Sequence, residues 1–139
     1  MKGDKIKYKN SYKYQLVEDY TVSVGVVPDK FVVDTPFILL NMKGVLTIKA
    51  GYAWDGATNP AWDTKTNMRA SLVHDALYQL MREEKISLSF RRHADSLLRD
   101  LMVEDGAFKI RAWYYFRAVQ LAGLKVATSE GEREILIAP

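Results

Sequence analysis

A histidine, an aspartate and a tyrosine occur in this chain in an order that could form an acid–base site. The segment His74-Asp75-Ala76-Leu77-Tyr78 is followed, one predicted helix later, by Asp95. A histidine works as general base near neutral pH when a carboxylate holds its far ring nitrogen, because the carboxylate fixes the tautomer and stabilises the imidazolium. We expect Asp95 to be that carboxylate and the Tyr78 hydroxyl to hold Asp95. The alternative is a buried His–Asp pair that only joins two helices.

Oxygen ligands for a cation lie beside these residues in the sequence. Asp75 follows the histidine directly, and the stretch 51–63 (GYAWDGATNPAWD) is a predicted loop that contains Asp55 and Gly56. Hard cations such as Ca²⁺ prefer carboxylate and carbonyl oxygens, and a bound cation would polarise an ester or phosphoryl oxygen for attack by water. The sequence therefore predicts Asp75, Asp55 and Gly56 as metal ligands, with Ca²⁺ as the cofactor. A turn shaped by Asp55-Gly56 alone is the other interpretation.

Two predicted helices would bring the acid–base residues together. Asn67 could cap a helix from Met68 to about Arg82, and Ser89 could cap one from Phe90 to about Glu104, with Gly106 ending it. The apolar face of the first helix would consist of Leu72, Val73, Ala76, Leu77 and Leu80, and that of the second of Ala94, Leu97, Leu98 and Leu101.

The active residues would lie at the margins of these apolar faces. His74 and Tyr78 are four residues apart and share one edge, while Asp75 points toward the polar side. Asp95 lies at the margin of the second face. If the two helices are antiparallel neighbours, as a short connection predicts, His74 meets Asp95.

The rest of the chain indicates an α+β fold in one domain. Residues 14–50 are rich in β-branched residues with turn signals, and predict a small antiparallel sheet or meander formed from 15–27, 31–33, 37–40 and 45–48, with a hairpin turn at 41–44. We divide the chain into a basic arm or edge strand (1–13), strands (14–50), a loop (51–66), helices (67–123) and a tail (124–139) that could dock as a strand or stay mobile.

The third predicted helix, from about Lys109 to Ala122 with Gly123 as its end, is dense in aromatic residues. Trp113, Tyr114, Tyr115 and Phe116 nearly encircle it. A helix that is apolar all round is usually sandwiched between other elements. An interface with another subunit is the alternative, since aromatic and arginine residues are typical of interfaces.

Other histidine and tryptophan residues have less specific interpretations. His93 precedes Asp95 by two residues but lies on the opposite edge of its helix, which favours a surface or packing role over a metal ligand. Trp54 and Trp62 could enter a lipid interface, but such residues more often anchor a loop to the core. A phosphohydrolase of the His…His-Asp…Asp type needs a histidine upstream, and none precedes His74.

Composition restricts the classes of protein to which the chain could belong. It has 139 residues, no cysteine and a formal net charge of +3, of which +4 lies in the first 13 residues and −1 in the remainder. Disulfides and thiolate metal sites are excluded. Neither a transmembrane run nor a signal peptide is recognisable. The basic arm fits a solvated edge strand or a contact to phosphates, but no nucleic-acid reader motif supports specific nucleic-acid binding.

The loop and helix motifs resemble those of an uncharacterised family of small phage and prophage proteins. The pattern is Gly51-x-x-Trp54-Asp55-Gly56-Ala57-x-x-Pro60, then His74-Asp75-x-Leu77-Tyr78, then Ala94-Asp95, over roughly residues 28 to 122. The resemblance implies synthesis in a host cytoplasm, a location there or in the virion, and other virion proteins as partners.

A more distant similarity is to secreted phospholipases A(2) and to the phospholipase domain of parvovirus capsid proteins. Their His-Asp-x-x-Tyr helix and later aspartate match His74, Asp75, Tyr78 and Asp95, and the parvovirus type has a Thr-Asn-Pro like that at 58–60. The similarity implies that His74 activates water, that Asp95 orients the His74 ring, and that Asp75 holds calcium together with a glycine-rich loop. This chain has only two glycines in 51–56 and no disulfides.

Two hypotheses follow for function. The first is a phage-encoded phospholipase-like ester hydrolase that acts on lipid or a membrane surface during infection. The second is a non-catalytic virion or assembly protein of the capsid or tail, with a structural His–Asp pair and an oligomer or partner contact through the aromatic third helix.

Overall fold

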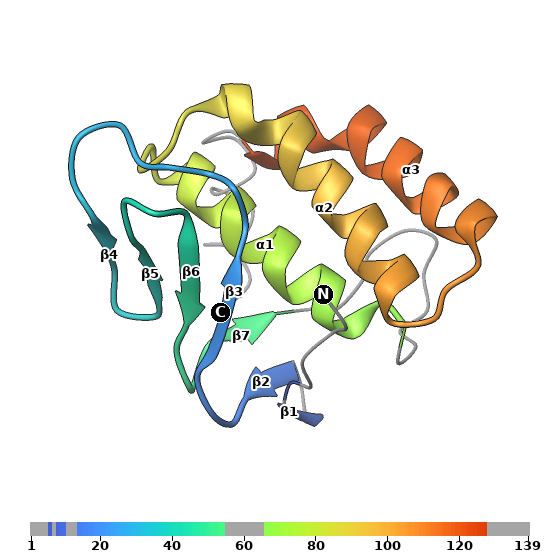
Figure 1. The fold of residues 1–139 in the computed structure, drawn as a ribbon, viewed down its shortest axis with the longest axis horizontal. Helices are drawn as coiled ribbons and strands as arrows, with labels where there is room; N and C mark the ends of the chain where they lie inside the picture. The colour runs from blue at the N-terminus through green and yellow to red at the C-terminus, as the bar shows by residue number, and fades with distance from the viewer. Residues whose placement is uncertain (1–5, 7, 11–13, 55–65, 128–139) are drawn as a thin grey trace.

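The computed structural model describes residue 6 and residues 8–10, 14–54 and 66–127, and it confirms the α+β fold class. Antiparallel strands occupy the first half of the chain and three α-helices the second (Figure 1). The basic arm apart from residues 6 and 8–10, most of the predicted loop and the tail from residue 128 lie outside the described residues.

The strands form two small antiparallel sheets where the sequence predicted one. The first sheet has the order β1-β2-β7 and the second the order β3-β6-β5-β4. Their bounds are β1 Tyr8–Asn10, β2 Tyr14–Leu16, β3 Tyr20–Ser23, β4 Val33–Asp34, β5 Ile38–Leu40, β6 Val45–Ile48 and β7 Ala53–Trp54. The two sheets are visible as separate groups of arrows in Figure 1.

The register of the four-stranded sheet places its apolar side chains on one face. Tyr20 lies opposite Ile48 and Val22 opposite Leu46, and on the other side of β6 the partner of Leu46 is Leu40. All five side chains are buried. Because successive strand residues face opposite sides, the alternating burial along β3, β5 and β6 makes this face the sheet's contribution to the core.

The predicted strand over 15–27 is divided between the two sheets. After β2 the chain bends at residues 17–19 before β3 begins. Leu16 donates its N–H to the Tyr52 carbonyl and accepts from the Gly51 N–H, whereas the Asp19 carboxylate accepts from the N–H of Ala50. These bonds tie both sides of the bend to residues 50–52, so the ladder cannot continue straight. Periodicity alone does not contain this information.

The prediction that residues 51–66 are all loop is wrong at Ala53 and Trp54. These two residues form β7, in which Ala53 pairs with Gln15 and Trp54 with Tyr14. The Trp54 side chain is buried, its Nε1 donates to the Ser71 hydroxyl at 3.0 Å, and its ring lies 5.8 Å from that of Tyr14. A two-residue strand is too short to produce a periodic pattern.

The helices begin close to where their predicted caps lie. The bounds are α1 Met68–Arg82, η1 Leu88–Phe90, α2 Arg91–Glu104 and α3 Lys109–Ala127. Asn67 is the residue before α1, but its side chain accepts no hydrogen bond from the helix N–H groups, and its amide donates to the Tyr115 hydroxyl on α3. Ser87 and not Ser89 caps the next segment, since its hydroxyl accepts from the Ser89 N–H.

The ends of α1 and α2 share one hydrogen-bond pattern. Ala107 N–H donates to the Met102 carbonyl and Gly106 N–H to that of Val103, with Gly106 at φ +105°. This Schellman motif confirms Gly106 as the end of α2. The same two bonds end α1, where the residue at positive φ is Glu84.

The predicted end of the third helix at Gly123 is wrong, because α3 continues to Ala127. Gly123 is not among the residues at positive φ. A Cβ atom at this position would overlap the Tyr78 hydroxyl oxygen. The glycine is therefore needed for close packing of α3 on α1, and it does not terminate the helix.

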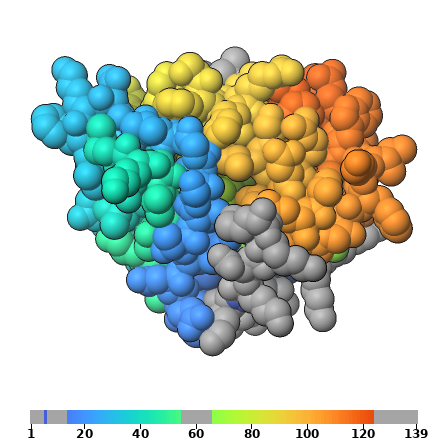
Figure 2. Space-filling view, in the orientation of Figure 1, coloured from blue at the N-terminus to red at the C-terminus, as the bar shows by residue number. Residues whose placement is uncertain are grey.

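The three helices form a layer beside the four-stranded sheet. Figure 1 shows α1 and α2 running antiparallel, with α2 drawn between α1 and α3 in this view, and all three helix pairs are in contact. The space-filling view shows the four-stranded sheet on one side of the molecule and α3 at the opposite margin (Figure 2). The predicted apolar face of α1, residues Leu72, Val73, Ala76, Leu77 and Leu80, is fully buried in the same cluster as the sheet residues.

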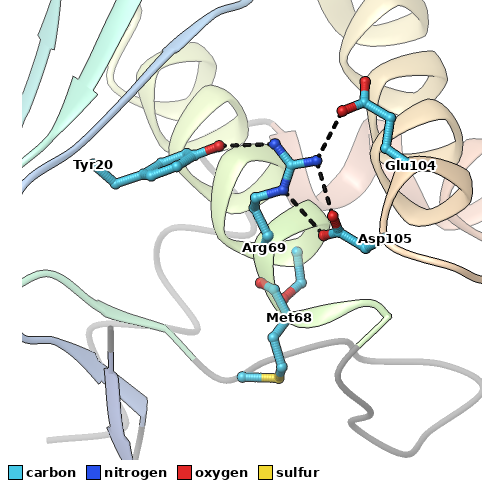
Figure 3. Close-up of polar contacts among 6 residues, drawn as sticks. Tyr20, Met68, Arg69, Glu104 and Asp105 are labelled. Carbon is cyan, nitrogen blue, oxygen red and sulfur yellow. Dashed lines mark hydrogen bonds and ion pairs between the residues drawn. The ribbon is translucent and has the colours of Figure 1, made fainter. Parts of the chain in front are cut away.

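Arg69 fixes α1 to both of its neighbours and was not anticipated from the sequence. Its side chain is 3% exposed, and its guanidinium donates to both Asp105 oxygens, to Glu104 and to the Tyr20 hydroxyl at 2.9–3.1 Å (Figure 3). The two acidic partners lie at the end of α2, and Tyr20 lies on β3. This network sets the position of the helix that carries His74. The signal in the sequence was a basic residue in a first helical turn, where the helix dipole disfavours a cation.

Candidate functional site

His74, Tyr78 and Asp95 form a compact buried triad between α1 and α2. The Nε2 atom of His74 lies 2.8 Å from Oδ1 of Asp95, and the Tyr78 hydroxyl donates to the same oxygen at 2.6 Å. The rings of His74 and Tyr78 have centroids 4.2 Å apart. The structure thus brings together the three residues that the sequence predicted as one unit, through the antiparallel helix pair that the prediction required.

The three side chains are more deeply buried than we expected from their predicted positions at the margins of the apolar helix faces. The Asp95 side chain has no exposed surface, and the His74 side chain is 9% exposed. Tyr78 is also buried. The reason is α3, which packs over this edge of the pair and brings Gly123 against the Tyr78 ring. Sequence reasoning interpreted Gly123 as a helix end and missed its role at the site.

Arg91 is a second contributor that the sequence analysis missed. Its Nη1 donates to the Gln120 carbonyl of α3 at 3.1 Å and lies 3.9 Å from Oδ2 of Asp95. Within the described residues that oxygen is buried and has no hydrogen-bond partner. Arg91 therefore places a positive charge close to that oxygen. The i, i+4 spacing of Arg91 and Asp95 was the signal available in the sequence.

Asp75 lies on the other side of the imidazole and faces solvent. Its Oδ1 is 3.9 Å from Nδ1 of His74, and its side chain is 37% exposed. This separation is too long for a direct hydrogen bond and is compatible with a bridging water. The two ring nitrogens therefore have different environments: Nε2 faces the buried Asp95, and Nδ1 faces the half-exposed Asp75.

The carboxylates on both sides set the protonation of His74. Burial of the ring opposes the charged form, but Asp75 and Asp95 outweigh it and hold the pKa of His74 above its ordinary value of 6.5. Burial and the bond to Asp95 also raise the pKa of Tyr78. Tyr78 consequently remains a hydrogen-bond donor to Asp95 at neutral pH.

The predicted metal site lies only in part among the described residues. Asp55 and Gly56 fall in 55–65, outside them, and Asp75 is the one predicted ligand that the structure describes. In the described ranges no three His, Asp or Glu side chains are arranged to hold a metal ion. The Gly51 carbonyl accepts from the Gln15 amide at 3.2 Å. Calcium binding therefore stays a prediction.

His93 and Trp54 have packing contacts. The Nε2 atom of His93 donates to the Val24 carbonyl at 2.6 Å and packs against Gly25, which ties α2 to the segment after β3. Trp54 anchors β7 to α1 through Ser71. Both observations agree with the packing interpretations. Trp62 lies outside the described residues.

A surface pocket of about 1020 Å³ lies away from the triad. Residues 27–29, 81–82 and 84–90 line it, at the end of α1 and the connection to α2. Its lining contains none of His74, Tyr78 and Asp95, so we assign it no part in the proposed chemistry.

The match to a family model covers most of this architecture. Residues 31–119 match the model described as protein of unknown function, DUF1353. The chain belongs to the DUF1353 family. The matched range contains β4 to β7, α1, α2 and the first part of α3, and with them His74, Asp75, Tyr78 and Asp95. No curated protein and no solved structure matches the chain. Among the described helices, none has the length and hydrophobicity needed to cross a membrane.

Proposed function

We propose that this DUF1353 protein is an ester hydrolase in which His74 is the general base. The observation that carries the proposal is the arrangement around the imidazole: Asp95 accepts from Nε2, which leaves Nδ1 as the nitrogen directed toward the half-exposed Asp75. A histidine held in this way has a fixed tautomer and a basic nitrogen on the side opposite Asp95. The site thus has the parts that base-catalysed attack by water requires.

The proposed step transfers one proton in each direction. Nδ1 of His74 takes a proton from water as the water oxygen forms a bond to the ester carbonyl carbon. The carbon–oxygen bond to the alcohol then breaks, and the imidazolium returns the proton to the departing alkoxide. Asp95 stabilises the imidazolium between these events. Tyr78 donates to Asp95 and keeps that carboxylate oriented.

Calcium at Asp75 is a separate part of the proposal. Asp55 and Gly56 would supply the other ligands, and a bound cation would polarise the ester carbonyl. No step above depends on it. A calcium titration followed by calorimetry tests this part: binding that is lost in Asp75→Asn and Asp55→Asn supports it, and absence of binding refutes it.

Phospholipid is the proposed substrate class, on the basis of the resemblance of His74, Asp75, Tyr78 and Asp95 to the phospholipase A(2) helix pair. The similarity to phage and prophage proteins supports a role during infection, with synthesis in the host cytoplasm and a place in the virion among other virion proteins.

The test is release of fatty acid from phospholipid vesicles in the presence of calcium. We expect His74→Asn to reduce the rate by about a hundredfold or more. His93→Asn is the matched control, because it makes the same change at the second histidine, which contacts Val24 and not the triad. Equal rates in the wild type and the His74 variant would exclude His74 as the base, and no release at all would exclude phospholipid as the substrate.

A non-catalytic virion or assembly protein is the second candidate, and one observation favours it. The His74 side chain is 9% exposed and lies between two carboxylates, as a structural ion pair would. This candidate predicts that phage carrying His74→Asn remain infectious and contain the protein at a fixed copy number per particle. Loss of infectivity with normal particle composition would favour catalysis.

A further inference from the structure

The outward face of α3 carries an apolar strip that no described element covers. Four large apolar side chains of α3 are exposed, and Phe108, directly before the helix, is exposed as well. Their exposed fractions are Ile110 78%, Trp113 55%, Tyr114 53%, Leu121 80% and Phe108 81%. α3 forms the margin of the molecule opposite the four-stranded sheet (Figure 2), so this face belongs to the molecular surface. Exposed apolar groups gathered in this way mark interaction sites.

The strip is distinct from the face that α3 uses for folding. Ala112, Tyr115 and Phe116 point inward and are buried. At about 100° per residue, Ile110, Tyr114 and Leu121 fall within about 40° of one another on the other side of the helix. Core packing therefore does not explain the outward residues.

Positive charge surrounds this strip. Lys109 and Arg111 lie about 120° and about 80° to either side of its centre, and Arg117 lies about 40° from the centre. From Lys109 to Ala127 the sequence contains no acidic residue. Arg117 contacts the Gln120 amide at 3.4 Å, and Arg111 the Tyr115 hydroxyl at 3.4 Å, and neither of these two contacts neutralises the charge.

We propose that this face of α3 binds the surface of an anionic phospholipid membrane, with the helix lying in the plane of the interface. Aromatic and aliphatic side chains would enter the headgroup boundary, and the flanking cations would contact lipid phosphates. Trp and Tyr are the side chains enriched at that depth. The inference goes beyond the proposed hydrolase, since membrane docking through α3 does not require catalysis.

The charges argue against a second copy of this chain as the occupant. Two α3 faces in contact would place Arg117 of one copy within the apolar strip of the other, and would add like charges without an acidic partner. An anionic lipid surface satisfies both the apolar and the basic components.

Co-sedimentation with vesicles tests the proposal. The vesicles contain phosphatidylcholine alone or phosphatidylcholine mixed with phosphatidylglycerol. We expect binding to the mixed vesicles only, weakened about tenfold in Leu121→Ser and about fivefold in Arg117→Gln. Phe31→Ser and Lys30→Gln are the matched controls, because Phe31 is also 80% exposed and Lys30 is exposed on the distant segment before β4. Thermal unfolding verifies that all four variants fold.

The outcomes separate the proposal from its rivals and from the hydrolase. Binding that His74→Asn retains and Leu121→Ser loses supports docking whether or not lipid is hydrolysed. Equal loss in the Phe31 and Leu121 variants, or no binding to anionic vesicles, overturns it. A concentration-dependent dimer that Leu121→Ser abolishes, without vesicle binding, would assign the face to self-association instead.

Discussion

At the scale of single residues, one oxygen of Asp95 accepts from both His74 and Tyr78, while the other lies 3.9 Å from Nη1 of Arg91. Removing any member leaves a buried polar group without its partner, which costs about 1–3 kcal/mol. The arrangement therefore contributes to stability whether or not it contributes to catalysis. Variants of these residues need a measurement of folding beside any measurement of rate.

The pKa of His74 predicts how stability depends on pH. Because this pKa is raised on folding, the stabilisation is fully present below pH 6.5 and is lost as the pH rises through the folded-state value. Denaturant unfolding of the wild type should therefore show a decrease in unfolding free energy above pH 6.5 that is missing in His74→Gln. His93→Gln should retain it. An unchanged pH dependence in His74→Gln would show that the imidazole is not charged in the folded protein.

Gly123 and Tyr78 should be energetically coupled. A methyl group at position 123 would overlap the Tyr78 hydroxyl, so Gly123→Ala should destabilise the protein by about 1–3 kcal/mol. The cost should be smaller in a Tyr78→Phe background, which removes the overlapped atom. A double-mutant cycle by chemical denaturation measures the coupling. Additive effects would contradict the close approach of the two helices.

At the scale of elements, the end of α1 contains a residue that its backbone conformation disfavours. Glu84 has φ +59° and occupies the position that glycine takes at the end of α2. We expect Glu84→Gly to stabilise the protein by about 1 kcal/mol, because a side chain in the left-handed region costs about that much. Glu83→Gly, at φ −85°, is the control and should not stabilise. A lower melting temperature for Glu84→Gly would contradict the assigned cap.

An element could be predicted from the sequence where the residues that determine its bounds lie within the element itself. The bounds of α1 could be predicted because its helical periodicity runs over 15 residues and Asn67 directly precedes it, although the Asn67 side chain makes no capping bond. The end of α3 could not, since Gly123 serves a contact with Tyr78 that is remote in sequence. The break between β2 and β3 depends on hydrogen bonds to residues 50–52, which also lie far along the chain.

The candidate site follows the same rule. The pairing of His74 with Asp95 could be predicted from two amphipathic helices and a short connection. The deep burial of the triad could not, because it results from α3 packing over that edge of the helix pair. The contacts of Arg91 with Gln120 and of Gly123 with Tyr78 also depend on the packing of α3.

At the scale of the whole molecule, the Arg69 network joins α1, the end of α2 and β3 in the interior (Figure 3). Arg69→Met should destabilise the protein by about 1–3 kcal/mol, because the partly buried Glu104 and Asp105 carboxylates and the buried Tyr20 hydroxyl lose their donor. Lys49→Met is the control: its ion pair with Asp34 is exposed and should contribute about 0–1 kcal/mol. Equal effects in denaturant unfolding would show that Arg69 does not organise the fold.

The most direct test of the proposed base is the tautomer of His74, measured by ¹⁵N NMR of the imidazole across a pH titration. We predict that the neutral ring carries its proton on Nε2, toward Asp95, and that Nδ1 is the nitrogen that titrates. A neutral ring protonated on Nδ1, or one that does not titrate before the protein unfolds, would contradict a catalytic role for His74.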